Sequence, residues 1–502
     1  MTEALRSIDP RTGEATGEPV PVTSPADVDR AATRAAAAAP AFAALPLATR
    51  AALLRGISAT LGAHADEIVA TADAETALGT ARLTGELGRT RVQFELFADA
   101  VEAGAFLEII IDKADLDAKP TPRPDLRRML VPLGPVAVYA ASNFPLAFSV
   151  PGGDTASALA AGCPVVVKAH EAHPRTSLLC ARLITEALAE GGAPDGVFSV
   201  VYGFEAGTAL VRHPAIKAAG FTGSLHGGRA LHDLAASRPE PIPFFGELGS
   251  VNPVVVTPAA LAERGPAIAE GYVASMTLGA GQFCTKPGVL FLPEGHGLDD
   301  ALAAAAAATT PHPLLHERIR DGYLAGVEAL AALPGVRVLA APGKGENGFS
   351  VRTGLFGVEE KYFRANTEVL LTECFGPASV VVEYAPESAA DLPSLIPGSL
   401  TATVHIGTDE DAAALVAGLA RRVGRIIVNG WPTGVAVTAA QQHGGPWPAA
   451  TTSQHTSVGE TAMRRWLRPV SYQDTPQALL PEVLKDTAEG TLPCRVSQSF
   501  GS

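Results

Sequence analysis

Cys284 is the residue of this sequence best suited to nucleophilic chemistry. It stands in Gly279-Ala-Gly-Gln-Phe-Cys-Thr-Lys-Pro287, directly after a stretch with helical periodicity, and the small residues before it let the backbone turn and expose the sulfur. The backbone N–H of Cys284 could then face the oxyanion that forms after attack on a carbonyl group. The alternative interpretation is a buried cysteine that only packs as a small apolar residue.

Two further polar residues could assist a thiol nucleophile, which needs a base or an electropositive setting near neutral pH. Glu247, in Phe244-Phe-Gly-Glu-Leu-Gly-Ser250, lies just before the first strand of a second predicted sheet, where we expect a cleft between two domains. Asn143 follows the predicted strand 136–139, and its amide could donate to an oxyanion. A solvated loop carboxylate and a turn asparagine are the alternatives.

A third group of residues favours a nucleotide. Phe221-Thr-Gly-Ser-Leu-His-Gly-Gly228 stands between a predicted strand and a helix, where N–H groups can hold a pyrophosphate, although a simple tight turn explains it equally well. Lys168 closes the strand 165–168, and Glu171 follows three residues later, so a cation and a carboxylate could meet ribose hydroxyls there. Glu373 is another carboxylate beside a turn.

The elements that must position these residues alternate between short apolar strands and helices. A helical region over about 26–110 precedes a proline-rich connection over 112–130, which we expect to be extended. Strand patterns then alternate with helical patterns, one of which covers 145–161. A second series of alternating strand and helix patterns begins near Val254. This alternation predicts an α/β protein with two parallel sheets and a cleft between them.

Composition excludes several classes of protein. The chain has 502 residues, of which 47% are apolar and 18% charged, as in folded globular proteins. Its net charge of −14 disfavours nucleic acid and anionic membranes as partners. The five cysteines form no C-x-x-C pair, and neither a secretory signal nor a long uncharged apolar run is visible. We therefore expect a cytoplasmic protein without disulfides.

Six motifs in order carry a resemblance: Asn143 before Phe-Pro, Lys168 after a valine strand, Phe-Thr-Gly-Ser, Gly-Glu-Leu-Gly, Gly-Gln-x-Cys and Glu-x-Phe-Gly-Pro. The chain resembles the NAD(P)-dependent aldehyde dehydrogenase superfamily over nearly its whole length. Around Pro241 to Pro253 and His443 to Thr452 it is similar to the branch that contains 2-oxoglutarate semialdehyde (2,5-dioxopentanoate) dehydrogenases and NADP-dependent fatty aldehyde dehydrogenases.

The resemblance implies a fold of two doubly wound, Rossmann-like domains with a small β oligomerisation element. The expected dinucleotide-binding domain is 1–111 with 132–249, the catalytic domain is 250–445, and the oligomerisation segments are 112–131 and 466–502. Family members pair through a strand that joins a neighbour's sheet, so a homodimer or homotetramer is expected.

The resemblance also implies roles. Cys284 would attack the aldehyde, Asn143 and the Cys284 N–H would hold the oxyanion, and Glu247 would activate the water that hydrolyses the thioester. Lys168 and Glu373 would hold the nicotinamide and adenosine riboses, with Phe375 near the nicotinamide. The glycine-rich turn contributes three further residues along the dinucleotide: Gly223, Ser224 and Gly228.

The cofactor is expected to be NAD or NADP, with a preference for NAD. In the family, a carboxylate at the place of Glu171 accepts from the ribose 2′-hydroxyl and repels the 2′-phosphate of NADP. Nearby His170, His173 and Arg175 could still host a phosphate. We predict no metal site, because the two histidines flank a loop before a proline without further ligands.

The sequence defines the small-molecule aldehyde substrate less well than the reaction or the cofactor. A semialdehyde carboxylate calls for an arginine, and Arg82, Arg89 and Arg91 are the candidates, with Arg89 preferred. Phe148, Phe283 and Trp447 are candidate apolar walls. Alternatives to semialdehyde oxidation are the oxidation of aliphatic or aromatic aldehydes, a CoA-acylating aldehyde dehydrogenase and a catalytically silent scaffold.

Overall fold

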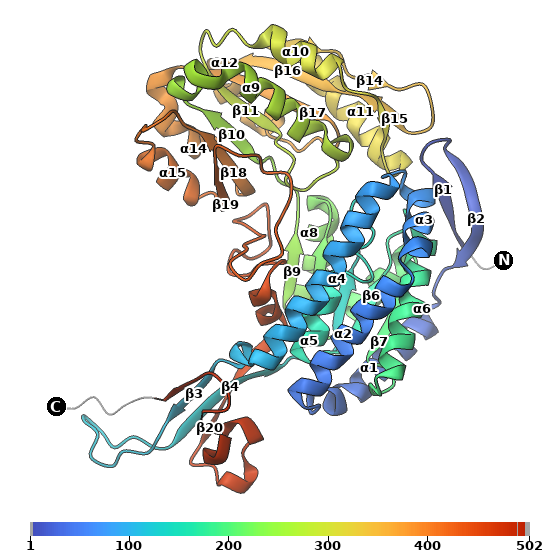
Figure 1. The fold of residues 1–502 in the computed structure, drawn as a ribbon, viewed down its shortest axis with the longest axis vertical. Helices are drawn as coiled ribbons and strands as arrows, with labels where there is room; N and C mark the ends of the chain where they lie inside the picture. The colour runs from blue at the N-terminus through green and yellow to red at the C-terminus, as the bar shows by residue number, and fades with distance from the viewer. Residues whose placement is uncertain (1–3, 489, 497–502) are drawn as a thin grey trace.

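The computed structural model describes residues 4–488 and 490–496. Two sheets with helices around them lie one above the other, and a narrow third sheet extends away from both (Figure 1). Of the predicted segments, residues 1–3, 489 and 497–502 lie outside the described part of the chain.

The first sheet has five parallel strands in the order β7-β6-β5-β8-β9. Its central strands are short runs of valine and alanine buried on both faces, which is typical of a parallel sheet covered by helices. The strands are β5 (Val136–Tyr139), β6 (Val165–Lys168), β7 (Phe198–Val201), β8 (Ala218–Thr222) and β9 (Phe244–Glu247). The crossover helices are α5 (Gly153–Ala161), α6 (Pro174–Glu190), α7 (Phe204–Arg212) and α8 (Leu225–Ala236).

An N-terminal layer of helices covers this sheet (Figure 1). It contains α1 (Pro25–Ala43), α2 (Leu47–Ala63), α3 (Ala65–Thr76) and α4 (Thr80–Ala103), preceded by the hairpin β1 (Ala4–Asp9) and β2 (Glu14–Pro21). Ser24 caps α1 by accepting from the Asp27 N–H, and proline occupies the first turn, as helix starts prefer. The long helix α4 matters most for the site, because its residues reach the loop after β5.

The second sheet has seven strands in the order β13-β16-β17-β11-β10-β18-β19, all parallel except the edge strand β13. The strands are β10 (Pro253–Val256), β11 (Val289–Pro293), β13 (Val336–Ala340), β16 (Gly354–Glu359), β17 (Ala378–Tyr384), β18 (Ser399–His405) and β19 (Val423–Val428). The helices are α9 (Pro258–Thr277), α10 (Asp299–Ala307), α11 (Glu317–Ala331), α12 (Glu360–Ala365), α13 (Thr367–Leu370), α14 (Leu392–Leu395) and α15 (Ala413–Ala420). Beside it lies a small sheet of β12 (His312–Pro313), β15 (Ser350–Arg352) and β14 (Gly343–Lys344).

The third sheet has the order β20-β4-β3-β21 and forms the arm at the lower left of Figure 1. Its strands are β3 (Ile109–Asp112), β4 (Leu126–Pro132), β20 (Leu467–Gln473) and β21 (Cys494–Val496). The two segments that we expected to serve oligomerisation therefore meet in one sheet, and this sheet starts at Ile109, three residues before the predicted boundary.

Two local predictions differ from the structure. The helical pattern over 145–161 becomes a helix only from Gly153, because Pro145 and Pro151 interrupt it and residues 144–152 form turns. Glu247, expected in a loop, is the last residue of β9. Within the described part of the chain, no helix is long and apolar enough to cross a membrane.

Candidate active site

Two cavities meet at Cys284. One of about 530 Å³ lies between the two large sheets and is lined by nine of the residues predicted for the reaction or its surroundings. These are Asn143, His170, Glu171, Gly223, Ser224, Glu247, Cys284, Glu373 and Phe375. The other, of about 240 Å³, is lined by residues of α4 and by phenylalanines, and it also reaches Cys284. Cys284 is thus a wall residue of both cavities.

The turn that carries Cys284 is shaped by left-handed backbone. Gly279, Ala280 and Gly281 have φ values of 57°, 57° and 68°, so the chain reverses at the end of α9 and presents Cys284 to the cleft. The buried Asn252 side chain donates from Nδ2 to the Cys284 carbonyl oxygen at 2.7 Å. This turn over residues 279–284, called the nucleophile turn below, is therefore held by its backbone conformation and by the buried side-chain amide of Asn252.

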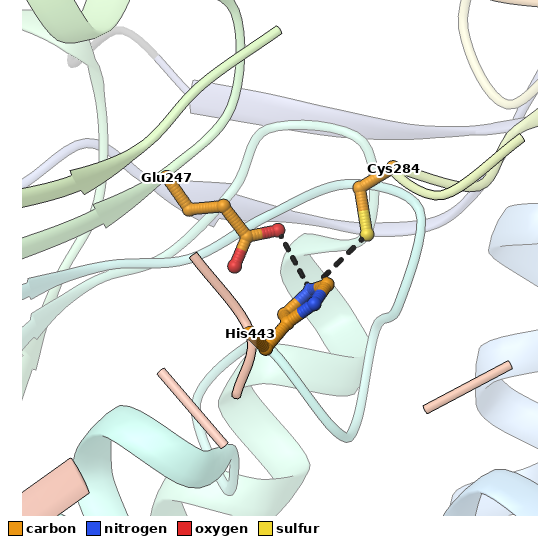
Figure 2. A group of neighbouring side chains, drawn as sticks. All are labelled: Glu247, Cys284 and His443. Carbon is orange, nitrogen blue, oxygen red and sulfur yellow. Dashed lines mark hydrogen bonds and ion pairs between the residues drawn. The ribbon is translucent and has the colours of Figure 1, made fainter. Parts of the chain in front are cut away.

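His443 lies between the sulfur and the carboxylate of the site (Figure 2). Its Nε2 atom is 3.4 Å from Cys284 Sγ and 3.0 Å from Glu247 Oε1. Ser457 Oγ donates to the other carboxylate oxygen, Glu247 Oε2, at 2.7 Å. Glu247 and His443 are both buried, so these interactions act in a poorly solvated environment.

The electrostatics of this group favour a neutral resting thiol beside a charged carboxylate. Burial, followed by the charge and hydrogen bond of Glu247, raises the pKa of the Cys284 thiol well above its usual range, and Arg89 opposes this shift. Burial also acts to raise the pKa of Glu247, but His443 and the Ser457 hydroxyl outweigh it and the pKa is lowered. The nucleophile therefore needs a partner that accepts its proton.

Asn143 is oriented by two neighbours. Its Nδ2 donates to the Gln282 carbonyl oxygen at 3.0 Å, and Arg82 donates to the Asn143 backbone oxygen at 2.8 Å. An amide nitrogen carries two hydrogens, so one remains to donate to an oxyanion next to Cys284.

The larger cavity fits a dinucleotide. Carboxylates stand at two places along it, Glu171 and Glu373, and carboxylates accept hydrogen bonds from ribose hydroxyls. Gly223 and Ser224 line the same cavity where α8 begins, a position that suits phosphate groups. The Glu373 carboxylate rests over Gly249, where a Cβ would lie 2.6 Å from Oε2, so only glycine leaves this space free.

Two residues predicted to hold the cofactor do not line this cavity directly. Lys168 is buried and forms an ion pair with Glu171, which lines it. Gly228 packs inside the first turns of α8, where a Cβ would lie 2.1 Å from Leu248 Cδ2. Gly228 thus allows α8 to approach Leu248, which itself lines the cavity.

The smaller cavity combines aromatic walls with arginines. Phe144, Phe148 and Phe283 line it together with Arg82 and Arg89. The Arg89 guanidinium lies 5.1 Å from the centre of the Phe148 ring. Its Nε and one terminal nitrogen are buried and have no hydrogen-bond partner among the described residues.

The structure does not bring Arg91 and Trp447 into this cavity. Arg91 Nε donates to the Ser58 carbonyl oxygen on α2, on the other side of α4. The Trp447 side chain is 51% exposed and lies under the guanidinium of Arg229 on α8. Of the residues expected to contact the aldehyde, Arg89, Phe148 and Phe283 lie at the cavity and Trp447 does not, because its backbone turns it to the surface.

His443 was not among the residues singled out for chemistry. The sequence contained one usable signal, since His443 is followed by two glycines and two prolines in a segment otherwise poor in charge, but nothing local indicated a distance to Cys284. The side-chain atoms of Glu247, Cys284 and His443 lie within 4.8 Å of one another, a spacing that can hold a metal ion. The expectation that the chain has no metal site therefore stays a prediction.

Comparison with known proteins decides the family. The model of the aldehyde dehydrogenase family matches residues 1–448. The chain belongs to this family. Among curated relatives, alpha-ketoglutaric semialdehyde dehydrogenase 2 of Azospirillum brasilense is 48% identical over 498 residues, covering 97% of this chain and 95% of the relative. The alpha-ketoglutaric semialdehyde dehydrogenase of Acinetobacter baylyi is 45% identical, covering 85% and 82%.

Solved structures agree on the fold. Aldehyde dehydrogenase 21 of Physcomitrella patens, solved with the reaction product succinate, has a TM-score of 0.79 at 23% identity and covers 94% of this chain and 95% of that one. A mutant of aldehyde dehydrogenase C of Pseudomonas syringae, solved with NAD⁺ and octanal, has a TM-score of 0.79 at 22% identity, covering 94% of each chain. The predicted resemblance and two-domain α/β fold are thus confirmed, and the protein is an NAD(P)-dependent aldehyde dehydrogenase.

Proposed function

We propose that this enzyme oxidises an aldehyde that also carries a carboxylate, such as 2-oxoglutarate semialdehyde, to the corresponding acid through a thioester on Cys284. The observation that carries the proposal is Arg89, which lines the same cavity as Cys284 and has two buried nitrogens without a hydrogen-bond partner among the described residues. The relatives named for alpha-ketoglutaric semialdehyde support this substrate class.

Charge in the smaller cavity favours an anionic substrate. Glu86 lies between Arg82 and Arg89 on α4, and its Oε1 accepts from the N–H groups of Leu146 and Ala147 at 2.8 and 2.9 Å. Burial raises the pKa of Glu86, and the two arginines oppose this shift. Since arginine stays protonated, the cavity keeps a net positive charge in either state of Glu86. A substrate carboxylate neutralises it.

In the first half of the reaction, Cys284 attacks the aldehyde carbon while its proton passes to the buried pair of His443 and Glu247. Nε2 of His443 lies 3.4 Å from the sulfur and 3.0 Å from Glu247, so the proton has a short path. The free hydrogen of the Asn143 amide stabilises the oxyanion. Glu171 and Glu373 would hold NAD(P)⁺ along the other cavity, and the cofactor would supply the hydride acceptor.

In the second half, Glu247 takes a proton from a water molecule that attacks the thioester. Its lowered pKa keeps the carboxylate ionised and able to act as a base. The Ser457 hydroxyl, which donates to Oε2, fixes the orientation of the carboxylate. Because transfer to CoA needs no such base, this arrangement favours hydrolysis over CoA acylation. It also disfavours a silent scaffold, which has no use for an aligned nucleophile and base.

Two further parts of the proposal concern cofactor choice and assembly. NAD is preferred, since the Glu171 carboxylate faces the cavity and repels a 2′-phosphate. The chain forms a homodimer or homotetramer through the edges of the β20-β4-β3-β21 sheet and of β19, whose Val428 is 48% exposed. A cytoplasmic location agrees with the free thiols of Cys163, Cys180, Cys284 and Cys374.

The test is the initial rate of NAD(P)H formation with 2-oxoglutarate semialdehyde, pentanal and benzaldehyde, each with NAD⁺ and with NADP⁺ and without CoA. We expect the highest kcat/KM with the semialdehyde and NAD⁺, and no turnover by Cys284→Ala. Higher kcat/KM with pentanal or benzaldehyde would replace the carboxylate-bearing substrate by the aliphatic or aromatic alternative. A requirement for CoA would contradict the hydrolytic step.

A further inference from the structure

Lys286 is a buried lysine that the reaction described above does not use. It follows Cys284 by two residues and is 2% exposed. Its Nζ donates to the carbonyl oxygens of Cys374 and Ala378 at 3.0 and 2.8 Å. These two carbonyls bracket the turn that contains Phe375 and follows Glu373. One side chain therefore links the nucleophile turn to the turn beside the cofactor cavity.

The same two turns touch through their backbones. A Cβ at Gly281 would lie 2.3 Å from the Gly376 carbonyl oxygen. Asn252 Nδ2, which donates to the Cys284 carbonyl oxygen, also donates to that of Lys286 at 2.9 Å. The start of the Lys286 side chain is thus fixed relative to the sulfur, and its end is fixed relative to Glu373.

The charge of Lys286 acts on the carboxyl group of Glu373. Glu373 is a carboxylate whose pKa is raised by burial to about 7, while Lys286 and the Ser250 N–H act to lower it. Cys284 and Cys374 are the other titratable groups that act with Glu373, and Glu368, Arg422 and His226 line a further cavity that Glu373 also lines.

An apolar side chain could fill the same space at lower cost. Burying an ammonium group is unfavourable unless it is hydrogen-bonded and paired, and ordering a lysine side chain loses conformational entropy. Burial accordingly lowers the pKa of Lys286. A lysine at so costly a position indicates that the site uses its hydrogen bonds or its charge.

We propose that Lys286 is a positioning residue for the cofactor: through the Cys374 and Ala378 carbonyls it fixes the turn after Glu373 against the nucleophile turn, and its charge favours the carboxylate form of Glu373, which accepts from a ribose diol of the dinucleotide. Lys286 touches neither substrate nor cofactor and acts through Glu373. The inference rests on the role proposed above for Glu373.

The test measures NADH affinity by fluorescence titration from pH 6 to 9, without turnover, in the wild type, Lys286→Met and Glu373→Gln. Wild-type affinity should fall as the pH drops through about 7, where Glu373 takes up a proton. In Lys286→Met the carboxyl loses its cationic neighbour, so this midpoint should rise by about one pH unit and affinity at pH 7 should fall about fivefold. Towards pH 9 most of the affinity should return.

Two controls separate charge from packing. Lys361→Met makes the same chemical change on the exposed surface of α12 and should bind NADH as the wild type does. Lys286→Gln keeps a donor for the two carbonyls but has no charge, so it should show the same upward midpoint shift, and it replaces Lys286→Met if that variant does not fold.

The outcomes are distinguishable. Unchanged midpoints in Lys286→Met and Lys286→Gln, or an affinity loss equal at every pH, would overturn the inference. If Glu373→Gln binds NADH with wild-type affinity and pH dependence, the proposed role of Glu373 fails instead. A pH dependence present in the wild type, shifted in Lys286→Gln and abolished in Glu373→Gln would support both.

Discussion

His443 places its Nε2 atom 3.4 Å from the sulfur of Cys284, although 159 positions separate the two residues in the chain. The contact forms because the segment after β19 crosses from the second sheet back to the first, where the Ser457 N–H donates to the His443 carbonyl oxygen at 2.8 Å. A residue that follows β19, the last strand of the second sheet in the chain, thereby reaches the nucleophile, which lies between the first two strands, β10 and β11.

Replacing His443 should slow the formation of the thioester. Without the imidazole, the thiol has lost one of the two groups that can take its proton, so kcat of His443→Ala should fall by about 10²-fold or more. His443→Gln, which can still donate to Glu247 but cannot act as a base, should be equally slow. Pre-steady-state NADH formation measures this step, and an unchanged rate in both variants would exclude His443 from proton transfer.

Glu247→Gln should separate the two halves of the reaction. Hydride transfer precedes hydrolysis, so this variant should release about one NADH per active site in a burst and then turn over very slowly. Rapid-mixing absorbance measures the burst, and protein mass after quenching should show the acyl group on the peptide that contains Cys284. A linear time course without a burst would mean that His443 alone cannot take the thiol proton and that Glu247 is required before the thioester forms.

The pH dependence of thiol alkylation tests the charges around Cys284. The thiol has a raised pKa, so its rate of reaction with iodoacetamide should increase with pH and reach half its maximum above the usual range of a cysteine. Glu247→Gln removes a negative charge that disfavours the thiolate, so this midpoint should fall, whereas Arg89→Leu removes a positive charge and the midpoint should rise. Shifts in the same direction would contradict the charge assignment.

Much of the fold and of the site could be predicted because each carries a local signal. The valine runs of β5, β6 and β10 are strands buried on both faces, and proline and glycine mark the turns between elements. The motif around Cys284 predicted a turn after a helix, and the left-handed residues 279–281 form it.

The rest depended on contacts that no local pattern contains. Trp447 is an aromatic residue of the kind that lines apolar pockets. Its backbone lies against Gly398 and its ring against Arg229, and the side chain is half exposed at the surface. Arg89 and Arg91 are equivalent in sequence, yet two residues along a helix turn the side chain by about 200°. One faces the cavity and the other faces Ser58 on α2.

Cofactor preference should respond to Glu171. Replacing its carboxylate by a hydroxyl removes the repulsion of a 2′-phosphate and leaves Lys168 free of its ion pair, so Glu171→Ser should raise the ratio of kcat/KM for NADP⁺ to that for NAD⁺ about tenfold or more. Arg175→Ser, at the start of α6, serves as a comparison that removes a positive charge instead. A ratio unchanged in Glu171→Ser would show that cofactor choice is made elsewhere.

The central claim is that Arg89 selects an aldehyde with a carboxylate, and the ratio of kcat/KM for 2-oxoglutarate semialdehyde to that for pentanal measures it directly. In Arg89→Leu this ratio should fall about 10- to 100-fold, because the charge-assisted bonds to the carboxylate are lost while the apolar wall remains. Arg91→Leu, on the opposite side of α4, should keep the wild-type ratio. An equal loss for both aldehydes in Arg89→Leu, or no loss for either, would contradict the claim.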